Sequence, residues 1–137
     1  MRSPAVVRLA ALIVAVGFAG LAVFQLALIA GAPLGRAAWG GMSTQLPTSL
    51  RLASVVAILI YGLGALFVLR RAGFPIRWIS PGLARWGTWA LVILLTLAAL
   101  PNFLSQSPWE RFLLGPTALL LAALCLLVAL KGKATVD

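Results

Sequence analysis

The sequence predicts an all-α membrane protein, a four-transmembrane-helix up-down bundle with both termini in the cytoplasm. Of its 137 residues, 63% are hydrophobic and only 9% are charged, whereas a water-soluble domain carries charge on about a quarter of its residues. Apolar runs follow one another along the chain, with lengths close to the roughly 20 residues that a helix needs to cross a bilayer. The composition therefore predicts one membrane domain over residues 1–137.

The first span is predicted over residues 6–30. It follows the pair Ser3-Pro4, which suits a helix cap and the first helical position. Arg8 can extend its side chain to the lipid headgroups. Because the apolar run is much longer than the roughly 7–15 residues of a signal-peptide core, we expect it to be retained as a transmembrane helix. Gln25 is the single polar residue deep in this span.

A connection of 19 residues, 31–49, follows the first span. Its glycines and prolines exclude a continuous helix. Its length exceeds that of most helix–helix connections, which indicates either a functional segment or disorder. Leu34, Trp39 and Met42 are residues that prefer packed or interfacial positions. We therefore predict an ordered segment that lies over the helix ends, and we call it the cap.

Three further spans are predicted over residues 50–69, 84–104 and 111–130. The third is short between Trp86 and Leu100, so its helix either begins at Pro81 or continues through Pro101. We favour continuation with a kink, because proline removes a backbone donor and clashes with the preceding turn. Small residues recur along the fourth span and predict a helix-packing face, formed by Ala118, Ala122, Cys125 and Ala129.

The basic residues determine the predicted orientation. A basic loop at residues 70–85 carries four arginines between the second and third spans. Together with the termini, this side of the membrane holds eight Lys and Arg residues, against Arg36, Arg51 and Arg111 on the other side. Positive charge accumulates on the cytoplasmic side, so we expect the termini inside and the cap outside. We also expect contacts with anionic headgroups at the cytoplasmic face and no binding of nucleic acid, because the basic residues form no patch of their own.

The turn between the third and fourth spans holds Glu110, the only acidic residue before Asp137. Ser107 precedes it in the pattern of a capping box, in which Glu110 would bond back to the N–H of Ser107. Three roles compete for Glu110, namely helix cap, partner of an arginine and ligand contact. We favour an ion pair with Arg36 or Arg51, which would reach across from the cap.

A candidate site combines charged and aromatic residues of the two outer connections. Arginine side chains beside tryptophans suit anionic or aromatic groups, through charge-assisted hydrogen bonds and cation–π contacts. The alternative is that the tryptophans are interfacial belt residues and the arginines bind lipid phosphates. The predicted residues for binding a ligand, lipid headgroup or partner are Arg36, Trp39, Trp109, Glu110 and Arg111.

The residue inventory argues against an enzyme. The chain has no His and only two acidic residues, so paired-carboxylate chemistry, histidine acid–base catalysis and ordinary metal sites lack their groups. We therefore predict no cofactor, no metal and a non-catalytic binding or accessory role. The alternative is an oligomeric transporter of a small molecule or lipid. The expected protein partner is a second copy of the chain or another membrane protein.

Four motifs of the outer connections stand out, Gly31-Ala32-Pro33 with Gly35, Ala38-Trp39-Gly40-Gly41, Leu46-Pro47-Thr48 with Leu50-Arg51, and Ser107-Pro108-Trp109-Glu110-Arg111-Phe112. With them, most of the chain resembles a group of small bacterial integral membrane proteins with four helices. The resemblance implies this fold and a location in a bacterial inner or plasma membrane, and it carries no catalytic residues. That group often has Trp where this chain has Leu34, so no role of an aromatic ring is carried over there.

Overall fold

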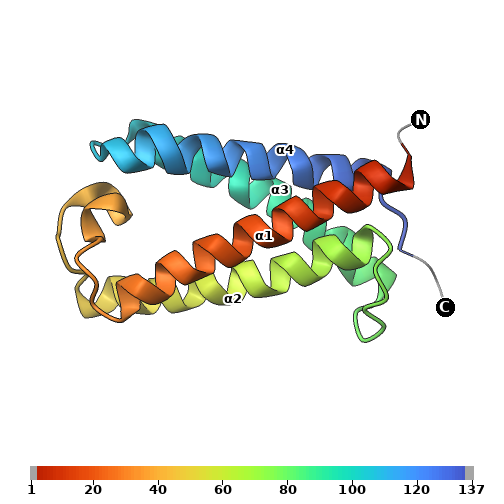
Figure 1. Ribbon diagram of the computed structural model, residues 1–137, viewed down its shortest axis with the longest axis horizontal. Helices are drawn as coiled ribbons and strands as arrows, with labels where there is room; N and C mark the ends of the chain where they lie inside the picture. The colour runs from red at the N-terminus through yellow and green to blue at the C-terminus, as the bar shows by residue number, and fades with distance from the viewer. Residues whose placement is uncertain (1–2, 135–137) are drawn as a thin grey trace.

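The computed structural model describes residues 3–134, which form four long helices and no strand (Figure 1). These helices are α1 (Pro4–Ile29), α2 (Thr48–Arg71), α3 (Pro81–Leu104) and α4 (Gly115–Lys131). Two short 3₁₀ helices lie in the cap, η1 (Gly35–Ala37) and η2 (Trp39–Gly41), and one π-helical turn, η3 (Glu110–Leu114), leads into α4. The predicted all-α class and four-helix fold are confirmed.

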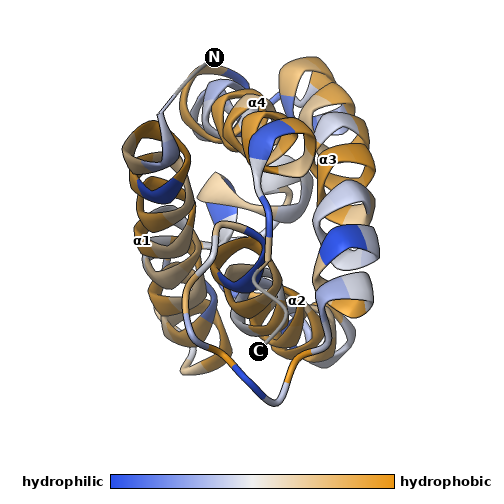
Figure 2. Cartoon of the chain, turned by 90° about the vertical axis from the view of Figure 1, so that its right-hand side faces the viewer, coloured by the Kyte–Doolittle hydropathy of each residue, from blue (hydrophilic) through white to orange (hydrophobic). Residues whose placement is uncertain are grey.

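The helices form an up-down bundle in which α1 packs on α2, α2 on α3, α3 on α4 and α4 on α1. Figure 2 shows α1 and α3 on opposite sides of the bundle. The start of α1 and the end of α4 lie at one end, here called the terminal end, and the cap lies at the other, the cap end (Figure 1). The side of the membrane that each end faces stays a prediction. Two charged residues of the termini, Arg2 (one of the eight basic residues counted on the predicted cytoplasmic side) and Asp137, lie outside the described residues.

Four helical segments are long and apolar enough to cross a membrane, namely α1, α2, α3 and Glu110–Lys131. Large apolar side chains also point away from the bundle, as Val16 on α1 and Leu59 on α2 do with exposed fractions of 72% and 60%. A helix that is apolar on all sides is typical of a membrane span rather than of a soluble bundle. Figure 2 shows how apolar the helices are, since most of their length is coloured as hydrophobic. The chain is therefore a small multi-pass membrane protein.

The helix starts differ from one another although three of them follow a Ser-Pro pair. At α3 the Ser80 hydroxyl accepts the N–H of Leu83 at 3.1 Å, so this serine caps the helix. At α1 the helix begins at Pro4, but the Ser3 hydroxyl makes no capping bond, and that part of the prediction is wrong. Helix α3 both begins at Pro81 and continues through Pro101 to Leu104, so both alternatives apply.

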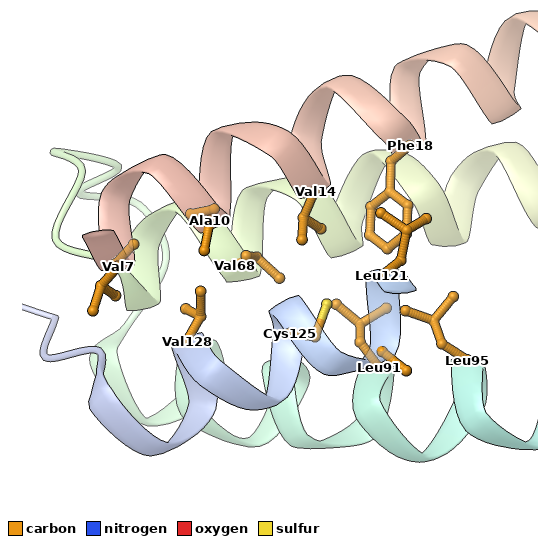
Figure 3. Close-up of a cluster of buried hydrophobic side chains, with 13 residues drawn as sticks. Val7, Ala10, Val14, Phe18, Val68, Leu91, Leu95, Leu121, Cys125 and Val128 are labelled. Atoms are coloured by element: carbon orange, nitrogen blue, oxygen red, sulfur yellow. The ribbon is translucent and has the colours of Figure 1, made fainter. Parts of the chain in front are cut away.

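The main hydrophobic core lies in the half of the bundle near the terminal end (Figure 3). All four helices contribute to this core. Phe18 lies at the side of the core nearer the cap end and has an exposed fraction of 1%. Gly64 allows the close approach of α2, because a Cβ there would lie 3.0 Å from the Phe18 ring and 2.9 Å from Leu91. The predicted small-residue face of the fourth helix is buried in the structure, at Ala118, Ala122, Cys125 and Ala129.

Two arginines of the predicted basic loop bind to the protein itself. Arg70 is buried, and its Nε donates to the carbonyl of Ile79 at 3.1 Å. Arg71 Nη2 donates to the carbonyl of Ala129 near the end of α4, at 3.0 Å. Charged donors bind carbonyls that a helix end leaves without a partner. These arginines therefore connect α2 to the neighbouring elements at the terminal end.

Candidate functional site

The cap is an ordered segment with an apolar cluster of its own. Leu28, Ala38 and Leu46 are buried together, and Phe24 and Leu50 pack against them. The cap folds back on itself at Gly35, whose N–H donates to the carbonyl of Thr44 at 2.8 Å. A side chain at Gly35 would overlap with the backbone carbonyl of Ser43. The last two residues of the predicted cap range, 48 and 49, already belong to α2.

Three consecutive cap residues have positive φ angles, Trp39 at 52°, Gly40 at 86° and Gly41 at 71°. Glycine adopts this conformation readily, whereas it is uncommon and costly for a residue as large as tryptophan. The turn directs the backbone N–H of Gly40, which is only partly buried, away from the rest of the cap. The partner of this N–H is the carboxylate of Glu110, whose two oxygens accept the N–H at 3.0 and 3.1 Å.

Glu110 is buried, with an exposed fraction of 5%. Its carboxylate also accepts the hydroxyl of Ser105 and does not return to the N–H of Ser107. The predicted capping box is therefore wrong in its second half. Instead, the N–H of Ser107 donates to the Ser105 hydroxyl oxygen at 3.0 Å, while Ser107 Oγ accepts the N–H of Glu110 at 3.4 Å. The carboxylate is thereby free to bind the cap.

The favoured ion pair of Glu110 is absent from residues 3–134, where only Gly40 and Ser105 bind its carboxylate. Arg51 Nε donates to the carbonyl of Leu46 at 2.9 Å instead. The reason is geometric, because the cap presents a backbone N–H to the carboxylate and directs its arginines elsewhere. The prediction of an arginine partner is wrong for the described chain.

Arg36 and Arg111 also point away from the carboxylate of Glu110. Arg111 Nη2 donates to the carbonyl of Ser105 at 2.8 Å. The backbone carbonyl of Arg36 accepts the hydroxyl of Ser107 at 2.6 Å, which fixes the cap on the turn before α4. Within the described chain the Arg36 side chain makes no hydrogen bond or ion pair, and it is exposed.

A cleft of about 820 Å³ lies beneath the cap, in the half of the bundle that the main core does not fill. In Figure 1 the pair α1–α2 and the pair α3–α4 diverge toward the cap end, and the cap lies between them. The cleft lining is mostly apolar, and it comes from all four helices, the cap and the turn before η3. Its polar side chains are Gln25, Trp39, Tyr61, Asn102, Ser105, Gln106, Glu110 and Thr117.

Gln25 also lines this cleft, although it is not among the predicted site residues. It is 8% exposed, and its Oε1 has no hydrogen-bond partner among the described residues. The signal in the sequence was one amide inside an otherwise apolar span, because polar side chains within a membrane are expensive and often functional.

The five predicted site residues divide into separate places. Trp39 and Glu110 line the cleft. Arg36 and Trp109 line a groove between α1 and α4, and Arg111 lines neither of the two spaces. Trp39 is held from the side of α2, where its indole N–H donates to the buried hydroxyl of Ser54 at 3.3 Å. The five residues thus do not form one cluster, and four of them line two adjoining spaces.

Within the described residues, no group of three His, Cys, Asp or Glu side chains could hold a metal ion. In comparisons with known proteins, no family model, curated protein or solved structure matches the chain. The resemblance to small four-helix bacterial membrane proteins therefore stays a prediction. The fold and its four candidate spans support the broader statement that this is a small membrane protein.

Proposed function

We propose that this protein has a non-catalytic binding role, and that its ligand is a small, mostly apolar molecule held in the cleft beneath the cap. Ligand pockets are typically concave, largely apolar and supplied with a few convergent polar groups, with volumes of about 300–1,000 Å³. The cleft, at about 820 Å³, has these properties. In this proposal the cap end faces outward, and the alternative of an oligomeric transporter stays a prediction.

The observation that carries the proposal is the unpaired carboxamide oxygen of Gln25. A buried acceptor without a partner costs about 1–3 kcal/mol. Gln25 retains this cost within an apolar span, where a leucine would avoid it. A ligand hydroxyl or N–H would satisfy the oxygen, so we propose that the ligand carries a hydrogen-bond donor on an apolar body.

The Glu110–Gly40 hydrogen bonds support a preformed site. They join the cap to the turn before η3 across 70 residues of sequence, and both residues line the cleft. A cap held in this way keeps the cleft in place before a ligand arrives. Preorganisation of this kind raises affinity because less conformational freedom is lost on binding.

The proposal can be tested with two competitors that differ only in a donor. The full chain in nanodiscs is labelled with a photoreactive long-chain alcohol, in competition with 1-decanol or with its methyl ether. We expect labelling of cleft residues such as Tyr61 and Leu104, with 1-decanol competing about tenfold better than the ether, as one added hydrogen bond to a buried acceptor implies.

Gln25→Leu should remove the preference for the alcohol while keeping or raising thermal stability, since it replaces an unpaired amide with an apolar side chain of similar size. Gln45→Leu is the matched control, because Gln45 is exposed and donates to Gly31 outside the cleft. Equal competition by the ether in the wild type, or an unchanged preference in Gln25→Leu, would rule out the proposed site.

A further inference from the structure

We infer that the groove between α1 and α4 is a separate site that binds one anionic phospholipid through Arg36. The inference does not depend on the cleft ligand, because Gln25 and Glu110 take no part in the groove. It concerns a neighbouring space at the same end of the molecule, which shares the lining residues Leu21, Phe24, Leu114 and Thr117 with the cleft. Its chemistry also differs, since the groove presents a cation and the cleft presents a hydrogen-bond acceptor.

The groove has a volume of about 650 Å³ and a mostly apolar lining. The groove ends on the side of the terminal end at Gly17, where α1 and α4 are so close that a Cβ would lie 2.9 Å from the side chain of Leu121. One turn further along α1 the helices have separated, because a Cβ at Gly20 would meet nothing within 4 Å. From Gly17 to Phe24 the groove follows α1 for about 10 Å at 1.5 Å per residue, which accommodates the upper part of an acyl chain.

Arg36 lies among the cap residues that line this groove. It differs from the two other arginines of the cap end, because the side chains of Arg51 and Arg111 already donate to backbone carbonyls at 2.9 and 2.8 Å. The guanidinium of Arg36 makes no such bond among residues 3–134. Its backbone is nevertheless held in place by the hydroxyl of Ser107, at 2.6 Å. The groove is thus provided with an uncommitted cation on a backbone that is held in place.

The occupant follows from this combination of an apolar channel and one cation at its mouth. A guanidinium matches the oxygens of a phosphate, to which it can donate two parallel hydrogen bonds. A zwitterionic lipid brings an ammonium group that competes for the same phosphate, whereas an anionic lipid leaves its negative charge to the arginine. Trp109 also lines the groove and is 60% exposed, which suits a ring at the headgroup level.

Native mass spectrometry of the full chain tests the inference. The protein is released from vesicles that contain equal amounts of phosphatidylglycerol and phosphatidylethanolamine with identical acyl chains. We expect the wild type to retain one phosphatidylglycerol with a preference of roughly fivefold, the factor that one basic residue contributes near a membrane surface. Arg36→Gln should abolish the preference. Arg111→Gln, which changes an arginine of the same end outside the groove, should leave it unchanged.

A second pair of variants tests whether the acyl chain occupies the groove. Gly20→Leu should fill the open space and abolish lipid retention, whereas Gly62→Leu should not, because its Cβ also meets nothing within 4 Å but lies outside the groove. Added glycerol phosphate should not displace the lipid, since it lacks the chain. Retention by Arg36→Gln or Gly20→Leu at the wild-type level, displacement by glycerol phosphate, or a wild type without preference would each overturn the inference.

Discussion

In the half of the bundle near the terminal end, side chains of all four helices meet, and Val14, Val68 and Val128 are completely buried. In the half near the cap end, the same four helices surround a cleft of about 820 Å³. Lipid tails are as apolar as leucine, so helices in a membrane are held together by close packing and hydrogen bonds. The cap half has only the small apolar cluster around Leu28, and hydrogen bonds of the cap join its parts.

The polar groups of the two halves differ in the same way. At the terminal end, Arg70 and Arg71 donate to backbone carbonyls of neighbouring elements. At the cap end, the Gln25 oxygen and the Arg36 guanidinium have no partner within residues 3–134. Arg71 Nε at the terminal end is also buried without a hydrogen-bond partner among the described residues. The Arg71 side chain is nevertheless anchored through Nη2, whereas the Arg36 guanidinium makes no hydrogen bond there. This difference supports the proposal that the terminal half serves stability and the cap half serves binding.

The largest expected difference between the halves comes from two phenylalanines of α1. Phe18 is 1% exposed, and the centroids of its ring and the Tyr61 ring are 5.5 Å apart. Phe24, by contrast, is half-buried and lines both the cleft and the groove. We expect Phe18→Ala to lower the free energy of unfolding by about 3–5 kcal/mol, and Phe24→Ala by about 1–2 kcal/mol, because a side chain beside an existing space leaves less packing to lose. Unfolding in mixed micelles of dodecyl maltoside and SDS, followed by circular dichroism, measures both. Equal losses would mean that the cap half is packed like a core.

A smaller effect is expected at Glu110, which holds the cap. Glu110→Ala leaves the N–H of Gly40 and the hydroxyl of Ser105 without their acceptor, so we expect a loss of about 2–4 kcal/mol. Glu110→Gln retains one acceptor oxygen, and we expect about half that loss. The same unfolding assay compares the two variants. The ion pair predicted from the sequence would make both variants almost equally costly, so equal losses would restore the charge as the main contribution and contradict the observed contacts.

The fold was accessible to sequence reasoning because spans depend on composition and length alone. The same holds for the buried small-residue face of α4. The partner of Glu110 was not accessible, because residue types show that a carboxylate and several arginines share one end but do not show which backbone N–H groups turn outward. Only the positive φ angles of the Trp39-Gly40-Gly41 segment direct an N–H at Glu110.

The candidate site was predictable in part, for a related reason. Arg36 and Trp109 are identifiable as a cation and an interfacial ring, and the structure brings both to one groove. The same reasoning groups Trp39 with them, although Trp39 lines the cleft and not the groove. Gln25 is visible as a polar residue in an apolar span. Its importance depends on the missing partner of its oxygen, which follows from the packing of the neighbouring helices rather than from its own helix.

The smallest expected effects come from the three serines of the Ser-Pro pairs, which look alike in the sequence and differ in the structure. Ser107 Oγ donates to the carbonyl of Arg36 at 2.6 Å and accepts the N–H of Glu110. Ser80 Oγ accepts only the N–H of Leu83, and Ser3 caps nothing. Loss of a helix cap costs about 0.5–2 kcal/mol and loss of one further buried hydrogen bond about 1 kcal/mol.

We therefore expect Ser107→Ala to lower the free energy of unfolding by about 2 kcal/mol, Ser80→Ala by about 1 kcal/mol, and Ser3→Ala by less than about 0.3 kcal/mol. Each change is the same deletion of one hydroxyl before a proline, so each variant is a control for the others in the same unfolding assay. Ser107 joins the cap to the α3–α4 turn, Ser80 caps a helix of the terminal end, and Ser3 contributes to neither.

A loss for Ser3→Ala as large as that for Ser80→Ala would show that the Ser-Pro pattern itself, rather than the contact each hydroxyl makes, determines the effect. A loss for Ser107→Ala no larger than that for Ser80→Ala would show that the hydroxyl does not hold the cap, and the division of the molecule into a packed half and a hydrogen-bonded half would lose one of its supports.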